Sequence, residues 1–177
     1  MQGSLIKISD TVVSSDTASV TITGIDSTYE IYKLKLNNIV PATNGQSLRM
    51  RITKGGTVQT DANYDEANHG IRSDQYSWND QYGTNATYWN KIGPWSTSNT
   101  STENGASGSA ILYLFNFDKT GENTFITVVG VGKWAQGLLG IQGCAVHTVD
   151  SASDGVNFFF GSGDIASGTF SLYGLKK

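Results

Sequence analysis

Cysteine and histidine are the residue types in this chain that suit nucleophilic catalysis. Cys144 stands three residues before His147, and side chains three apart on a strand point to opposite faces, so the pair cannot act as nucleophile and base. We expect a small buried thiol and a histidine on a strand face. Ser162 lies between two glycines but lacks the strand–turn–helix setting of a nucleophile elbow, so we expect a turn there.

Acidic residues could bind a metal or cleave a glycosidic bond. Asp61, Asn63, Asp65 and Glu66 have the spacing with which a calcium loop begins, but the Gly at loop position 6 and the Glu at position 12 are absent. The two histidines lie too far apart for zinc spacing. No pair stands out among the 15 acidic residues as a glycosidase pair. We therefore predict no metal, no cofactor and no catalytic residue.

The segment from about residue 60 to 109 combines aromatic rings with amide and hydroxyl side chains. Such rings stack on sugars while amides bind sugar hydroxyls, and the same composition suits protein interfaces. The rings could equally close one end of the core. All three interpretations stay open, and the candidates for contact with a glycan or a partner are Tyr76, Trp78, Trp89 and Trp95.

Charge and hydropathy exclude two classes of partner. The net charge is −3, and the closest basic residues, Arg49 and Arg51, share one face of an expected strand. Nucleic-acid binding requires a more concentrated basic patch, so we expect no nucleic-acid partner. No apolar stretch approaches the roughly 20 residues of a membrane span, and no signal peptide is visible, so we expect no membrane partner. The single cysteine excludes an internal disulfide.

The elements that position these residues follow a period of two. Apolar residues alternate with polar ones over 30–40 and 47–53, and Asn44-Gly45 lies between these stretches, which predicts a hairpin. Residues 110–117 are apolar on both phases, which is typical of a central strand covered on both faces. Turn signals every 8–15 residues favour one all-β domain over 1–177, an antiparallel β-sandwich. We expect a loop-rich insertion at about 60–109 that ends in an exposed loop over 96–109.

Several stretches together are similar to a known group of proteins. Residues 20–34 (VTITGIDSTYEIYKL), 38–45 (NIVPATNG) and 48–51 (LRMR), with the ending 168–175 (GTFSLYGL), resemble virion structural proteins of tailed bacteriophages, common in phages of marine bacteria and cyanobacteria. The resemblance covers about the first 65 residues and the last 15. It implies a jelly-roll-like β-sandwich outside a virion, as a tail-fibre, tail-tip or capsid-decoration subunit. It also implies a homotrimer without catalytic residues.

The function expected from the sequence is therefore a non-enzymatic bacteriophage virion structural protein, made in the bacterial host cytoplasm. Its expected partners are copies of itself, other virion proteins and a host cell-surface glycan. Such a subunit should expose apolar residues on the protomer and bury them between copies. The alternative is a carbohydrate-binding module, and the second alternative is a glycan hydrolase, which needs polar catalytic groups converging in a cleft.

Overall fold

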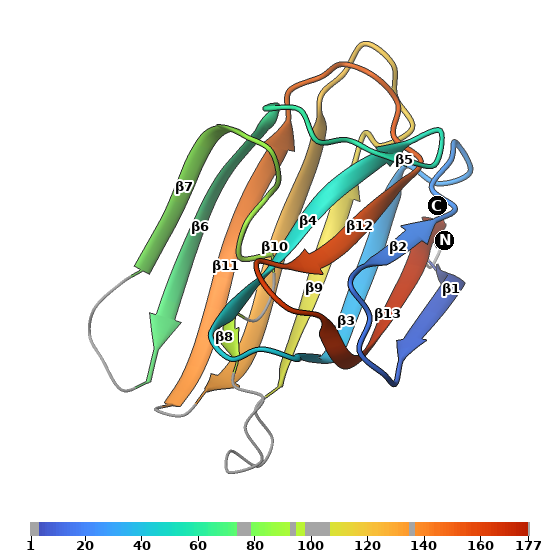
Figure 1. Ribbon diagram of the computed structural model, residues 1–177. Helices are drawn as coiled ribbons and strands as arrows, with labels where there is room; N and C mark the ends of the chain where they lie inside the picture. The colour runs from blue at the N-terminus through green and yellow to red at the C-terminus, as the bar shows by residue number, and fades with distance from the viewer. Residues whose placement is uncertain (1–3, 74–78, 93–94, 98–106, 135–136, 177) are drawn as a thin grey trace.

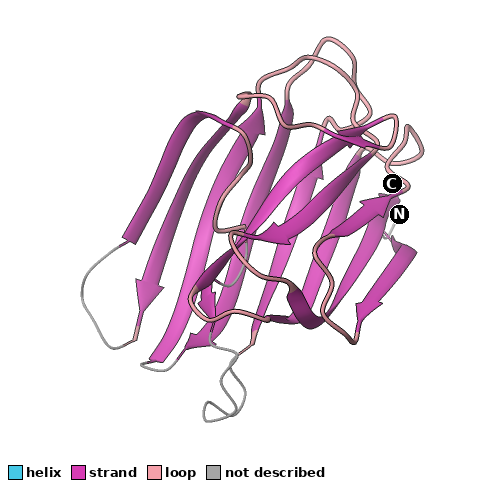
Figure 2. Ribbon diagram, viewed as in Figure 1, coloured by secondary structure: helices cyan, strands magenta, loops and turns pink. Residues whose placement is uncertain are grey.

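The computed structural model describes residues 4–73, 79–92, 95–97, 107–134 and 137–176. Strands joined by turns make up this part of the chain, as Figure 2 shows. Within the same residues, no helix has the length and apolar character needed to cross a membrane.

The strands form two antiparallel sheets that lie face to face (Figure 1). In spatial order, the large sheet contains β1 (Ser4–Val13), β13 (Ile165–Lys176), β3 (Ile31–Pro41), β9 (Gly108–Phe115), β10 (Thr124–Trp134), β11 (Gly137–His147), β6 (Tyr64–Arg72) and β7 (Asn79–Ala86). The small sheet contains β2 (Val20–Thr23), β12 (Gly155–Phe160), β4 (Gln46–Lys54) and β5 (Thr57–Val58), and β8 (Trp95–Thr97) pairs with β4. The prediction of an all-β, antiparallel sandwich is confirmed.

The core lies between the sheets and is made by one phase of each alternating strand. Leu34 on β3 and Leu112 on β9 are fully buried, as are Met50 and Ile52 on β4. Phe158 of the small sheet meets Phe170 of the large sheet with ring centroids 5.3 Å apart. Each buried aliphatic or aromatic side chain of this kind contributes about 1.5–3 kcal/mol of transfer free energy. The period of two therefore fixes which face of each strand turns inward.

The predicted hairpin between residues 30–40 and 47–53 is wrong. β3 pairs with β13 and β9 in the large sheet, whereas β4 pairs with β12 in the small sheet. The connection over residues 42–45 thus crosses from one sheet to the other. Two alternating strands bury their apolar faces equally well as neighbours in one sheet or as partners across the core, so alternation does not distinguish these arrangements.

The segment at 60–109 contains more regular structure than predicted. β6 and β7 complete one side of the large sheet and β8 joins β4, so residues 64–72 and 79–86 are strands and not loop. Every second side chain of β6 points into the core, among them Tyr64, Glu66 and Asn68. Because Glu66 and Asn68 are polar, the sequence does not show this alternation as a pattern of apolar residues. Within the predicted loop over 96–109, Gly108 and Ser109 begin β9, and residues 98–106 lie outside the described residues.

Two glycines of β11 provide a matched test of how closely β11 and β6 pack. A Cβ on Gly143 would overlap Oδ1 of Asn68 and lie 2.7 Å from the Ala67 carbonyl oxygen, whereas one on Gly140 would meet nothing within 4 Å. We expect Gly143→Ala to lower the free energy of unfolding by about 1–3 kcal/mol through overpacking. Gly140→Ala should leave it unchanged or raise it by up to about 1 kcal/mol. Urea denaturation of both variants checks this, and equal stabilities would contradict the packing described.

Candidate functional site

The face of the large sheet that points away from the small sheet is apolar along its centre; we call it the outer face. Ile111 and Tyr113 of β9 are each 40% exposed, and Phe125, Val129 and Val131 of β10 are 45%, 61% and 47% exposed. Leu138 of β11 and Ile71 of β6 continue the face to one side, each 55% exposed. Monomeric soluble proteins rarely leave a contiguous apolar surface of this kind uncovered.

The strand register places these side chains next to one another. Val129 pairs with Ile111 on one side and with Gln142 on the other, and Phe125 pairs with Phe115 and Val146. The prediction that residues 110–117 form a central strand is confirmed for 110–115, but within the protomer only one of its two faces is covered. The small sheet covers Leu112 and Leu114, while Ile111 and Tyr113 remain on the outer face.

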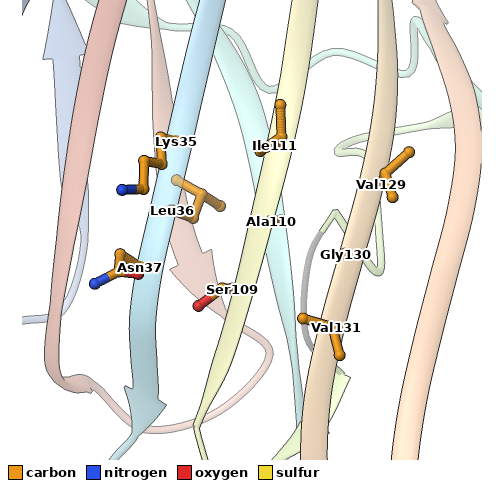
Figure 3. A pocket seen from close by; sticks show the side chains of 9 residues that line it. All are labelled: Lys35, Leu36, Asn37, Ser109, Ala110, Ile111, Val129, Gly130 and Val131. Carbon is orange, nitrogen blue, oxygen red and sulfur yellow. The ribbon is translucent and has the colours of Figure 1, made fainter.

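Two open hollows interrupt the outer face. The first, about 270 Å³, has Lys35 and Asn37 of β3 on one side and Val129 and Val131 of β10 on the other (Figure 3). Ser109 of β9 lies between them, because it is the ladder neighbour of Val131. Its side chain is too small to fill the space. The second, about 280 Å³, lies over β11 and β6, where Ala67 and Cys144 are small. Larger side chains of a partner could enter both.

Charged side chains lie on both sides of the apolar centre. Lys33 and Lys35 of β3 point to the outer face on one side, and the Lys33 ammonium lies 5.7 Å from the centroid of the Tyr113 ring. Asp65 of β6 lies on the other side and accepts a hydrogen bond from the Asn85 amide at 2.7 Å. Lys33 and Lys35 thus lie on one side of the apolar centre, beside the Lys7–Asp10 ion pair of β1, and Asp65 lies on the other side.

Cys144 and His147 lie on opposite faces of β11, as predicted. His147 is buried at 1% exposure, and its ring lies 4.7 Å from the ring of Tyr64. The expectation of a buried thiol is wrong, because Cys144 is exposed on the outer face. Its neighbours in the ladders are Thr127 and Ala67, which leave the sulfur uncovered. No nucleophile–base pair forms between these two residues.

Burial of His147 makes the stability of the fold depend on pH. Burial lowers the pKa of His147 from 6.5 to about 4, so the unfolded chain takes up the proton first as the pH falls. The contribution of neutral His147 is complete above the unfolded pKa and is lost as the pH falls from about 6.5 towards about 4. We expect the free energy of unfolding to drop by about 2 kcal/mol between about pH 7.5 and about pH 5.

Urea denaturation at the two pH values measures this drop. His147→Gln should remove most of the pH dependence, because glutamine does not titrate. His69→Gln is the matched control: His69 is only partly buried on β6, so its variant should keep the wild-type drop. If the free energy of unfolding of His147→Gln fell by as much as that of the wild type, His147 would not be the source of the pH dependence.

Of the four aromatic candidates, Trp89 is the one whose side chain lies within the described residues. Trp89 is fully buried, its indole N–H donates to the Val146 carbonyl oxygen at 3.0 Å, and its ring lies edge-on to Tyr64. Core packing is therefore the role of Trp89, which cannot stack on a glycan from this position. The backbone of Trp95 pairs with Ser47, while its side chain, like Tyr76 and Trp78, lies outside the described residues.

The acidic residues near the start of β6 serve the backbone. Glu66 is 7% exposed, and its Oε2 accepts the Asn90 amide at 2.5 Å, while Asp65 binds the Asn85 amide. Within the described ranges, no group of three or more His, Cys, Asp or Glu side chains could hold a metal ion. Residues 161–163 form the bend between β12 and β13, which confirms the turn predicted at Ser162.

Comparison of the chain with protein-family models, with curated proteins and with solved structures finds no match. The function is therefore inferred from the chemistry of its own surfaces.

Proposed function

We propose that this chain is a non-enzymatic structural subunit of a bacteriophage virion and assembles with copies of itself through the outer face. The observation that carries the proposal is the row of apolar side chains on β9 and β10, which no described residue covers. An apolar surface of this extent gains free energy when it leaves water, at roughly 25 cal/mol per Å². Burial between subunits supplies this gain without changing the fold.

The outer face is large enough for a stable interface. Eight strands about 4.8 Å apart make a sheet roughly 35 Å wide, and the eight residues of β9 extend it over roughly 27 Å. That surface, on the order of 900 Å², matches the roughly 800 Å² per partner of a standard protein interface. In a closed trimer the two neighbours of each copy share this face, and covering most of it suits a permanent assembly.

The distribution of charge favours another copy of this chain as the partner. Lys33 and Lys35 lie on one side of the apolar centre and Asp65 on the other, so the two lysines of one copy can meet Asp65 of the next. Opposed potentials of this kind fix register and disfavour other partners. A homotrimer is the assembly we propose, because the resemblance to phage structural proteins implies one, and in a closed ring each copy offers two different parts of its surface to its two neighbours.

The virion setting is supported by the resemblance of residues 20–34, 38–45, 48–51 and 168–175 to phage structural proteins. Composition agrees with it, since charged residues make up only 15% of the chain and hydroxyl and amide side chains provide most of its polarity. The position in the particle that we propose is a tail fibre, a tail tip or a capsid decoration.

Mass spectrometry of purified virions tests the setting, with cryo-EM to locate the chain in the particle. We expect the chain to be present in a fixed ratio to the other virion proteins. Particles that are infectious and complete without the chain would refute the virion role.

A further inference from the structure

The side of the small sheet that points away from the core has a cluster of two arginines and two aromatic rings, which we call the arginine cluster. The Arg49 guanidinium carbon lies 4.3 Å from the centroid of the Tyr88 ring. The Arg51 guanidinium carbon lies 4.6 Å from the Phe159 centroid and 5.8 Å from that of Tyr88. The two rings meet edge to face with centroids 5.9 Å apart. Both guanidinium groups are thus held against the same aromatic pair.

Three separate parts of the chain build this cluster. Arg49 and Arg51 occupy the outward phase of β4, whose inward phase supplies Leu48, Met50 and Ile52 to the core. Phe159 is the ladder partner of Arg49. The backbone of Trp89 exchanges two hydrogen bonds with that of Met50, and because Trp89 turns inward, its neighbour Tyr88 turns outward beside the arginines.

The two guanidinium groups form no ion pair with a carboxylate of the described residues. Arg51 donates from Nε to the Thr87 carbonyl oxygen at 2.9 Å. Nε of Arg49 is buried and has no hydrogen-bond partner within the described part of the chain. Both guanidinium carbons lie within 6 Å of the Tyr88 centroid, and like charges this close repel each other, a repulsion that a bound anion would offset.

We propose that the arginine cluster binds the carboxylate groups of an acidic polysaccharide. The guanidinium fork matches a carboxylate with two parallel hydrogen bonds, and stacking on rings orients the fork beforehand. The exposed Thr21 of β2 offers a hydroxyl for a sugar on the same face of the sheet: Asn157 is the ladder partner of both Arg51 and Thr21, and its amide donates to the Thr21 hydroxyl at 2.9 Å. The net charge of the chain is −3, so a polyanion can be attracted only by a local group of positive charges such as this cluster. This proposal does not depend on the virion role, because it concerns the isolated chain.

Binding of the full chain to polygalacturonate tests the proposal, with neutral dextran and dextran sulfate as comparison polymers. We expect the wild type to bind polygalacturonate and not dextran. Arg49→Gln/Arg51→Gln should weaken binding at least about tenfold, since hydrogen bonds between charged groups are the strong ones. Arg49→Lys/Arg51→Lys keeps the charge but loses the fork, and should bind with intermediate affinity.

Lys119→Gln/Lys176→Gln is the control, because it removes two positive charges at exposed positions away from the cluster and should bind like the wild type. Two outcomes would refute a carboxylate site. One is that Lys119→Gln/Lys176→Gln weakens binding as much as Arg49→Gln/Arg51→Gln does, and the other is that the wild type binds dextran sulfate more tightly than polygalacturonate. The wild type also gives a readout that needs no variant: the Nε–Hε NMR signals of the arginines should shift when oligogalacturonate is added. Unchanged signals would equally overturn the proposal.

Discussion

Ile111→Glu/Val129→Glu is expected to convert the assembled chain into a folded monomer. The two residues are ladder neighbours at the centre of the outer face, and 40% and 61% of their surfaces are exposed on the protomer. On the free chain the new carboxylates remain hydrated, so the free energy of unfolding should change by less than about 1 kcal/mol per site. Between subunits the carboxylates would be buried without partners, which costs several kcal/mol for each ion.

Size-exclusion chromatography with light scattering measures the mass of each species. We expect the wild type to run as an oligomer, with the trimer as the proposed state, and the variant to run at the mass of one chain. Thr23→Glu/Thr57→Glu is the matched control, because both threonines are exposed strand residues of the small sheet. This control should remain assembled. A wild type that stays monomeric at high concentration, or a variant that stays assembled, would contradict assembly through the outer face.

Trp89→Ala is expected to have the largest effect on the stability of the protomer, about 4 kcal/mol. Trp89 is fully buried. Its indole N–H donates to the carbonyl oxygen of Val146 in the large sheet, and its backbone pairs with that of Met50 in the small sheet. Truncation to alanine leaves a cavity at the place where the segment after β7 joins the core, and it leaves the Val146 carbonyl oxygen without this donor.

Trp89→Phe is the comparison, because phenylalanine refills most of the cavity and removes only the indole hydrogen bond, at about 1–2 kcal/mol. Thermal and urea unfolding of the two variants give the ranking. If Trp89→Ala were as stable as the wild type but had lost glycan binding, Trp89 would be a ligand-binding residue and its place in the core would be wrong.

Where apolar and polar residues alternate clearly, the sequence could predict the strand and which of its faces turns inward, but it did not predict β6 and β7. Alternation in residues 47–53 identified Leu48, Met50 and Ile52 as core residues, and all three are fully buried. A period of two indicates which side chains of one strand point to the core and which point to the surface. It does not report which strand lies beside another, so the hairpin of residues 30–53 was predicted where the chain crosses between sheets.

The candidate site was harder to predict, for a physical reason that Ile111 and Tyr113 illustrate. Apolar residues on both phases of a strand indicate that both faces lose contact with water in the final state. They do not indicate whether the cover is part of the same chain or a second subunit. The arginine cluster shows a different limit: Arg49 and Arg51 were visible as neighbours, but Tyr88 and Phe159 reach them only through the tertiary fold.

The lone thiol of Cys144 offers the most direct test of assembly through the outer face. Cys144 is exposed on the protomer and lies on the outer face between Thr127 and Ala67, so it reports whether that face is covered. The measurement is the rate of alkylation by iodoacetamide, followed by intact mass, for the wild type and for Ile111→Glu/Val129→Glu at the same concentration. We predict slow alkylation of the assembled wild type and fast alkylation of the monomeric variant. Equal, fast rates in both would show that the outer face remains open to water and would contradict the proposed assembly.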